Sequence, residues 1–336
     1  MHGMTDEDRM YSVRVAPWHI EQTNSIVLDA APERRAERIA LAGHDWTVEE
    51  TPIFRKVERV VEDGVAVTYP KLGEWKALYR SDTQGILHVA KDSYTRVQNI
   101  VGHELFEALA KDARLDDGTG GTIEGGKVCY LMARLDEPFQ IEGDDSETYP
   151  YVVVTWTHDG SGALQARATN IRVVCWNTWS ASEAQAARTG RRYTFRHTSK
   201  VMERVGEAKR ALAGVREETR VFQEIANELA KISVSDGTRE DFVQEFIPEP
   251  VGKVISDRVK GNIETARAKV RGLFDGRTIP EAHRNTAYGL VLAGTEYLDH
   301  LRGFRSTDTY LGRTLLREEA LKARLVPMVQ DLVAAA

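Results

Sequence analysis

The stretch Tyr151–His197, YVVVTWTHDGSGALQARATNIRVVCWNTWSASEAQAARTGRRYTFRH, decides the fold class. Two runs rich in β-branched residues, Tyr151–Thr157 and Ile171–Cys175, are separated by the turn His158-Asp159-Gly160-Ser161-Gly162. Such runs on either side of a glycine turn are typical of strands in one sheet. The stretch therefore predicts a mixed or antiparallel sheet in the first two thirds of the chain.

The residues on either side add further strands and then helices, so the fold class is α+β. A glycine-rich segment, Gly118–Gly121, is expected to be a hairpin loop, and Asn177–Ala187 is expected to begin a helix. Alternating patterns predict strands over Trp46–Glu49, Ile53–Val61, Val65–Tyr69, Ile86–Val89 and Lys127–Leu135. Helical spacing predicts Ala31–Gly43, Ile100–Lys111 with Asn99 as its cap, a long supporting helix over Lys200–Ile232, and C-terminal helices over Asp257–Phe274, Ile279–Leu301 and Leu315–Leu332.

Pro248-Glu249-Pro250 is the strongest candidate for a linker, because two prolines in three residues interrupt both helix and strand. We therefore expect an N-terminal arm over residues 1–30, an α+β core domain over 31–247 and a helical C-terminal region over 251–336.

Composition is that of a soluble globular protein: 42% of the 336 residues are hydrophobic and 29% are charged, with a net charge of −6. No apolar run approaches the ~18–20 residues of a membrane span. The first residues, MHGMTDEDRM, carry no secretory pattern, and we expect a cytoplasmic protein. Cys129 and Cys175 sit in apolar β-branched runs and are expected to be buried, reduced thiols.

Against this acidic background, residues 163–216 hold eleven Lys or Arg and three Glu, a local excess of eight positive charges. The cations alternate with aromatic side chains, and that combination suits single-stranded nucleic acid, whose phosphates take the charge and whose bases stack on rings. Cations that solvate an edge strand are the competing interpretation. The candidate nucleic-acid-binding residues are Arg167, Arg172, Arg188, Arg191, Arg192, Tyr193, Arg196, His197 and Lys200.

The turn after Thr157 holds the side-chain types of an acid–base site. Consecutive residues of one turn do not converge easily, so a structural role is favoured and a ligand contact is the alternative. The residues concerned are His158, Asp159, Gly160 and Ser161, together with Asn177 and Thr178. The nine histidines are scattered, no phosphate-binding motif follows a strand, and we expect no metal and no cofactor.

An ordered series of motifs resembles the phage/plasmid-like protein family, a domain of unknown function numbered 932. These motifs are Pro17-Trp18-His19, Trp46-Thr47-Val48, Arg80-Ser81-Asp82-Thr83, Tyr94-Thr95-Arg96-Val97-Gln98-Asn99, Glu124-Gly125-Gly126-Lys127, His158-Asp159-Gly160-Ser161, Arg172-Val173-Val174-Cys175, Asn177-Thr178, Arg196-His197-Thr198, Asn285-Thr286-Ala287-Tyr288-Gly289 and Thr295-Glu296-Tyr297-Leu298-Asp299-His300. The resemblance covers nearly the whole chain. It implies carriage on phages and plasmids in a bacterial cytoplasm, and it carries over no catalytic residue.

Three functions stay open at this point. The leading hypothesis is a phage or plasmid protein of DNA metabolism that binds single-stranded DNA, like the annealing proteins of recombination, without nucleotide hydrolysis. A homo-oligomeric state is left open. The second is an accessory protein whose acidic surface engages a host protein. The third is a hydrolase or nuclease around His158 and Asp159.

Overall fold

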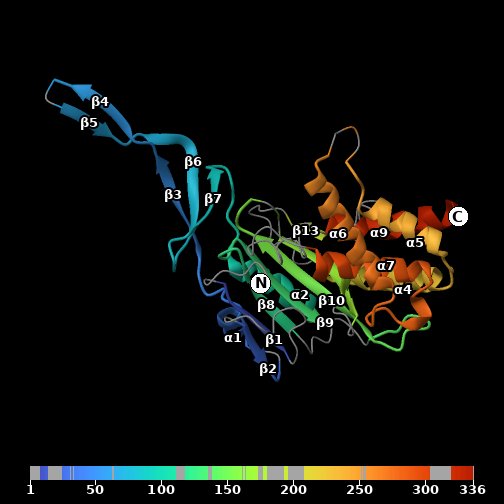
Figure 1. Ribbon diagram of the computed structural model, residues 1–336. Coiled ribbons are helices and arrows are strands. Elements are labelled where there is room, and N and C mark those ends of the chain that lie inside the picture. The colour runs from blue at the N-terminus through green and yellow to red at the C-terminus, as the bar shows by residue number, and fades with distance from the viewer. Residues whose placement is uncertain are drawn as a thin grey trace.

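A mixed eight-stranded sheet lies at the centre of the protein in this computed structural model (Figure 1). Its strands run in the order β12-β11-β10-β9-β8-β1-β2, and β13 also pairs with β11. All neighbours are antiparallel except β1 and β2. The strands are β1 (Met10–Val13), β2 (Ser25–Leu28), β8 (Gly118–Ile123), β9 (Val128–Arg134), β10 (Thr148–Thr157), β11 (Leu164–Arg172), β12 (Asn177–Trp179) and β13 (Tyr193–Phe195).

The structure describes residues 8–13, 25–30, 32, 34–62, 64–110, 118–134, 138–160, 162, 164–172, 177–179, 193–195, 208–250, 252, 255–302 and 319–335. The α+β class is confirmed, with a mixed sheet followed by helices. The helices are α1 (Arg35–Leu41), α2 (Asn99–Ala110), α4 (Ala208–Ala230), α5 (Asp236–Phe246), α6 (Asp257–Phe274), the 3-10 turn η2 (Glu281–His283), α7 (Ala287–Glu296), the π-helical turn η3 (Tyr297–Leu301) and α9 (Glu319–Ala335). No described helix has the length and apolar character needed to cross a membrane.

One face of the central sheet packs against α2. Alternate residues of β9 and β10 point to this face, where Leu131, Val154 and Trp156 are buried with Leu105 and Phe106 of the helix. The long helix α4 continues the layer, since it contacts α2, β10 and β11. Its prediction as a supporting helix is confirmed over Ala208–Ala230.

A second hydrophobic core lies among the helices α4, α5, α6, α7 and α9. It joins Phe242 and Val243 of α5 to Val270 and Phe274 of α6, which lie on opposite sides of Pro248-Glu249-Pro250. Residues on both sides of the expected domain boundary therefore share one core. The boundary itself stays a prediction, as does the N-terminal arm.

A smaller three-stranded sheet, β3-β6-β7, leaves the body beside α2 (Figure 1). It consists of β3 (Val48–Phe54), β6 (Lys71–Arg80) and β7 (Ile86–Lys91), and its far end continues into the two-stranded hairpin β4 (Val57–Val61) and β5 (Gly64–Thr68). We call the three strands the projecting sheet and the hairpin Val57–Thr68 the tip hairpin. The tip hairpin agrees with the strand predicted over Val65–Tyr69, whereas the strand predicted over Ile53–Val61 is divided between the end of β3 at Phe54 and β4, which begins at Val57.

Three local predictions are wrong. Gly118–Gly121 is not a hairpin loop but buried strand β8, because these glycines let β1 lie very close: an added Cβ at Gly121 would meet the Arg9 carbonyl oxygen at 2.7 Å. Ile279–Leu301 is not one helix, because the Thr286 hydroxyl accepts a hydrogen bond from Gly289 N–H and starts α7 afresh. Asn99 does not cap α2: it is the first residue of that helix, and its side chain bonds to the sheet instead.

Gly102 shows how tightly α2 packs on the sheet. A Cβ added there would lie 2.5 Å from Trp156 Cε3, whereas one added at Gly261 in α6 would meet nothing within 4 Å. We expect Gly102→Ala to destabilise the protein by about 1–3 kcal/mol through overpacking. We expect Gly261→Ala to stabilise it by up to about 1 kcal/mol through helix propensity. Urea denaturation measures both, and a stabilising Gly102→Ala would contradict the close approach.

Candidate functional site

Strand β11 brings several of the predicted nucleic-acid-binding residues to one edge of the central sheet. Arg167 and Arg172 lie on it, paired with Val153 and Thr148 of β10. On its other side β13 pairs with the first part, where Tyr193 lies opposite Ala166, and β12 pairs with the last part. The predicted extended segment around Tyr193 is therefore a strand beside the one that carries Arg167 and Arg172.

The other predicted residues of this set, together with Ser161, lie outside the part of the chain that the structure describes. They are Arg188, Arg191, Arg192, Arg196, His197 and Lys200. In the sequence, Arg191 and Arg192 directly precede β13 and Arg196 directly follows it. Cys175, expected in a strand, also lies outside the described residues.

Asn177 and Thr178 occupy a strand rather than the predicted helix start. Strand β12 pairs antiparallel with β11, with Asn177 opposite Arg172 and Thr178 opposite Ile171. The correction has a local cause, since the β-branched Thr178 and the aromatic Trp179 favour extended backbone. The pairing places this motif at the same sheet edge as Arg172.

His158 is buried at the end of β10, where it is only 2% exposed. Its Nε2 lies 2.8 Å from Asn99 Oδ1, and its ring packs edge-on against Trp46 at 5.3 Å between centroids. Gly160 has a φ of +75°, and a Cβ there would lie 2.7 Å from His88 Nε2. The His158 imidazole therefore holds the turn against α2, and the close approach of Gly160 to His88 holds it against the projecting sheet.

The Asn99 carboxamide connects four elements of the fold. Its Oδ1 accepts hydrogen bonds from Trp156 Nε1 at 3.0 Å and from His158 Nε2. Its Nδ2 donates to the carbonyl oxygens of His44 at 3.2 Å and Trp46 at 3.1 Å. The Cys129 thiol is 3.6 Å from the same Oδ1, and burial raises the pKa of that thiol well above its ordinary value. The buried Cys129 is thus an unreactive group, as predicted for a reduced thiol.

A chain of buried hydrogen bonds runs beside Asn99 through two imidazoles. His44 Nε2 donates to the Gly121 carbonyl oxygen at 3.0 Å, so His44 Nδ1 must accept from His103 Nε2, also at 3.0 Å. His103 Nδ1 then accepts from Arg38 Nε at 3.5 Å, and the Arg38 guanidinium pairs with Glu107. Each group can act in one direction only, which fixes both tautomers and keeps both rings neutral.

Burial gives these imidazoles strongly lowered pKa values. Desolvation lowers the pKa of His44 to about 4 and that of His103 to about 2, and the nearby cations Arg80 and Arg38 act in the same direction. The Glu107 carboxyl has a lowered pKa because Arg35 and Arg38 bind its charged form. The cluster contains two neutral imidazole rings and the Glu107 carboxylate paired with Arg35 and Arg38, an arrangement that suits a structural role rather than proton transfer near neutral pH.

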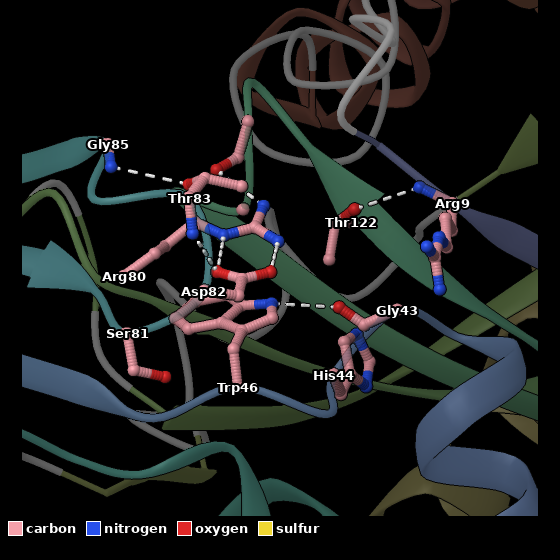
Figure 2. A network of polar contacts seen from close by, with 12 residues as sticks. Arg9, Gly43, His44, Trp46, Arg80, Ser81, Asp82, Thr83, Gly85 and Thr122 are labelled. Carbon is pink, nitrogen blue, oxygen red and sulfur yellow. Dashed lines mark hydrogen bonds and ion pairs between the residues drawn. The ribbon is translucent and has the colours of Figure 1, made fainter.

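Arg80 ties the base of the projecting sheet to the turn between β8 and β9. Its guanidinium forms a fork with the Asp82 carboxylate, donates to the Gly125 carbonyl oxygen at 3.1 Å and lies 4.6 Å from the Trp46 ring centre. Figure 2 shows Trp46 beneath this fork, with its indole N–H directed at the Gly43 carbonyl oxygen. The Arg80 hydrogen bonds lower the pKa of Asp82.

The same turn is held from the N-terminal side by Asp8, which is fully buried. Its two carboxylate oxygens accept hydrogen bonds from Gly125 N–H at 3.0 Å and Gly126 N–H at 3.1 Å. Within the described residues, no three His, Cys, Asp or Glu side chains gather as a metal site would require. These polar groups are satisfied by one another, which is how buried polar networks contribute to a unique fold.

His44 and His103 stand out in no sequence pattern, and Asn99, predicted as a helix cap, belongs instead to the buried hydrogen-bond network. The two histidines are 59 residues apart in the chain, so no local spacing could reveal their contact. The available signal was composition: three histidines, two tryptophans and an asparagine within or beside strongly apolar runs must find buried partners.

The comparison with known families agrees with this pattern of motifs. Residues 86–320 match the family model described as a domain of unknown function, DUF932. The chain belongs to this family. The match begins at β7 of the projecting sheet and includes the central-sheet strands from β8 onward, α2, α4 and most of the helical core, so the family's shared part includes both Asn99 and the β11 edge. No curated protein and no solved structure matches the chain.

The two neutral imidazoles make stability depend on pH. Below pH 6.5 the unfolded chain takes up protons on His44 and His103, whereas the native rings stay neutral down to pKa values of about 4 and 2. Stability should therefore fall as the pH drops from 7.5 to 5.5, by roughly 1 kcal/mol for each ring. Urea denaturation across this range, where carboxylates stay ionised, measures the loss.

His103→Gln is the matched variant, because its amide can donate to His44 and accept from Arg38 without titrating. The difference in pH dependence between wild type and this variant isolates the ring of His103, and we expect it to remove about half of the loss. An equal slope for both proteins would show that the native imidazoles titrate normally.

Proposed function

We propose that this member of the domain of unknown function 932 family binds single-stranded nucleic acid along the β11 edge of its central sheet. One observation carries the proposal. Strands β12 and β13 both pair with β11, the strand that holds Arg167 and Arg172, and the other arginines of the set lie close to β13 in the sequence. The proposal extends to a role in phage or plasmid DNA metabolism of the annealing kind, without nucleotide hydrolysis.

The charge distribution supports this assignment. Residues 163–216 carry eleven Lys or Arg against three Glu, while the whole chain has a net charge of −6. A local cationic surface on an acidic body attracts phosphates at that place alone and resists general coating of duplex DNA. Aromatic residues alternate with the arginines at Tyr193 and Phe195, which suits base stacking.

The architecture gives such a surface a rigid base. Strand β11 lies between β10 and the two short strands, and α4 packs against β11 and β10. Binding residues mounted on a supported strand hold a ligand in a defined register more readily than residues in a loop.

We do not propose a hydrolytic role for His158 and Asp159. The His158 ring is 2% exposed and its Nε2 is directed at Asn99, so it has no access to a substrate bond. An accessory role through the acidic surface is the outcome that remains if nucleic acid does not bind.

The test compares two charge-matched variants in gel shifts and fluorescence anisotropy with single-stranded and duplex DNA over a salt series. The first carries Arg191→Gln, Arg192→Gln and Arg196→Gln. We expect it to bind single strands weakly, with a salt dependence flatter by about 0.7 log–log units for each lost phosphate contact. Tyr193→Ala should cost about 1–3 kcal/mol of binding free energy if a base stacks on the ring.

The control variant carries Arg258→Gln, Lys260→Gln and Arg324→Gln, which removes the same charge from exposed positions of α6 and α9. It should bind like wild type. Arg→Lys changes at the first three positions should restore part of the affinity, since lysine keeps the charge and loses the planar fork. If wild type does not bind, or if both triple variants lose affinity equally, the proposed site is wrong. Circular dichroism establishes that each variant is folded.

A further inference from the structure

The projecting sheet carries the tip hairpin well away from the body (Figure 1). Burial along β6 shows where the body ends: Lys71–Trp75 are exposed, whereas Ala77, Leu78 and Arg80 are buried. All five residues of β5 are exposed, and β4 is nearly so. A two-stranded hairpin alone in water is marginally stable, so its apolar residues call for a partner.

The two edges of the tip hairpin differ in chemistry. Strand β4, with its flanks, carries Lys56, Glu58, Arg59 and Glu62, the kind of charge that protects an edge strand from pairing. Strand β5 reads Gly-Val-Ala-Val-Thr over Gly64–Thr68 and has neither charge nor proline. In the described part of the chain it pairs with β4 alone, which leaves its outer edge open.

We propose that the occupant of this edge is a second copy of the chain, with the two β5 strands paired antiparallel about Ala66. The inference goes beyond nucleic-acid binding and is independent of it. The dimer would form a continuous four-stranded sheet in the order β4-β5-β5-β4.

The backbone supports this register. Val61 and Gly64 flank the hairpin turn, and Arg59 lies opposite Ala66. Hydrogen-bonded and non-hydrogen-bonded pairs alternate outward from such a turn, so the N–H and C=O groups of Val65 and Val67 point away from β4. In an antiparallel pair centred on Ala66, Val65 of each copy faces Val67 of the other, and these outward groups satisfy one another. The strand is thus complementary to itself.

The side chains agree with the backbone. Val60 is opposite Val65, so these two residues and Val67 share one face of the hairpin, where they are 89%, 58% and 43% exposed. Pairing of two β5 strands would align six valines as one apolar stripe across four strands. In this register Thr68 faces Gly64 of the second copy, and Tyr69, which is 61% exposed, lies one residue beyond that pair.

Nucleic acid fits the tip hairpin less well than a second copy does. Three lysines along the projecting sheet and beside the tip hairpin pair with neighbouring acids: Lys56 with Glu58, Lys71 with Asp92 and Lys76 with Glu50. Strand β5 itself offers a phosphate no charge at all.

The first test measures the oligomeric state of the full chain by light scattering and sedimentation over a dilution series. Wild type should be dimeric. Val67→Lys should raise the dimer dissociation constant at least about tenfold, because each copy loses an apolar contact and gains an edge charge. Val61→Lys is the matched control: this valine is 49% exposed, lies on the opposite face and belongs to β4, so dimerisation should be unchanged.

The second test fixes the register. The Cα atoms of a non-hydrogen-bonded antiparallel pair lie about 4.5 Å apart, within disulfide range. Ala66→Cys should therefore form a disulfide-linked dimer under mild oxidation, and Val61→Cys should not. A monomeric wild type, a dimer insensitive to Val67→Lys, or a dimer that Ala66→Cys fails to cross-link would each overturn the proposal. Circular dichroism establishes that every variant is folded, so that loss of the dimer can be assigned to the β5 edge and not to unfolding.

Discussion

The Asn99 carboxamide is the constraint on which the arrangement of α2, the central sheet and the projecting sheet depends. One small side chain at the start of α2 accepts from Trp156 and His158 of the sheet and donates to the carbonyl oxygens of His44 and Trp46. A buried amide has four hydrogen-bonding positions, and all four are used. Any shift of α2 along the sheet would leave several buried polar groups unpaired, at about 1–3 kcal/mol each. The glycine at position 102, pressed against the Trp156 ring, enforces the same register by sterics.

The projecting sheet is anchored through the same region. Trp46 lies two residues before β3, which begins at Val48, and Arg80 ends β6 with its guanidinium held between Asp82, the Gly125 carbonyl oxygen and the Trp46 ring. The extension thus leaves the body from a base in which the buried Arg80 guanidinium packs on the buried Trp46 ring and pairs with the partly exposed Asp82 carboxylate. That base lets the projecting sheet hold the tip hairpin away from the body, although few of its outer residues are buried.

Local sequence patterns predicted the parts of the fold that local physics controls. The tip hairpin, α1, α6 and the strands β9 and β10 have the expected alternation or helical spacing, and each lies where that pattern places it. Two of the failures involve residues whose role is set by distant partners. Gly118–Gly121 has loop composition, but Met10 and Tyr11, more than 100 residues away, need the space that these glycines leave. Asn99 is a residue type that commonly caps helices, but its side chain forms hydrogen bonds with Trp156 and His158 instead. No local signal pointed to the pairing of His44 with His103, whereas the excess of Lys and Arg over residues 163–216 is visible in composition alone.

The β11 edge, where the central sheet ends in β12 and β13, and the open outer edge of β5 are chemically opposite, and this contrast argues for two different partners. The edge at β11 lies where arginines and rings gather in sequence, so it suits a charged ligand that is itself mostly solvated. The edge at β5 has no charge and an exposed valine face, so it suits a partner that offers the same surface. A dimer joined at the tip hairpins would carry two β11 edges, each on its own body. A single-stranded nucleic acid bound at both β11 edges of the dimer would gain affinity through effective concentration and not through new contacts. The link between the two proposals is therefore one of avidity, and a monomeric variant would keep the binding of a short oligonucleotide while it lost the added affinity for a long one.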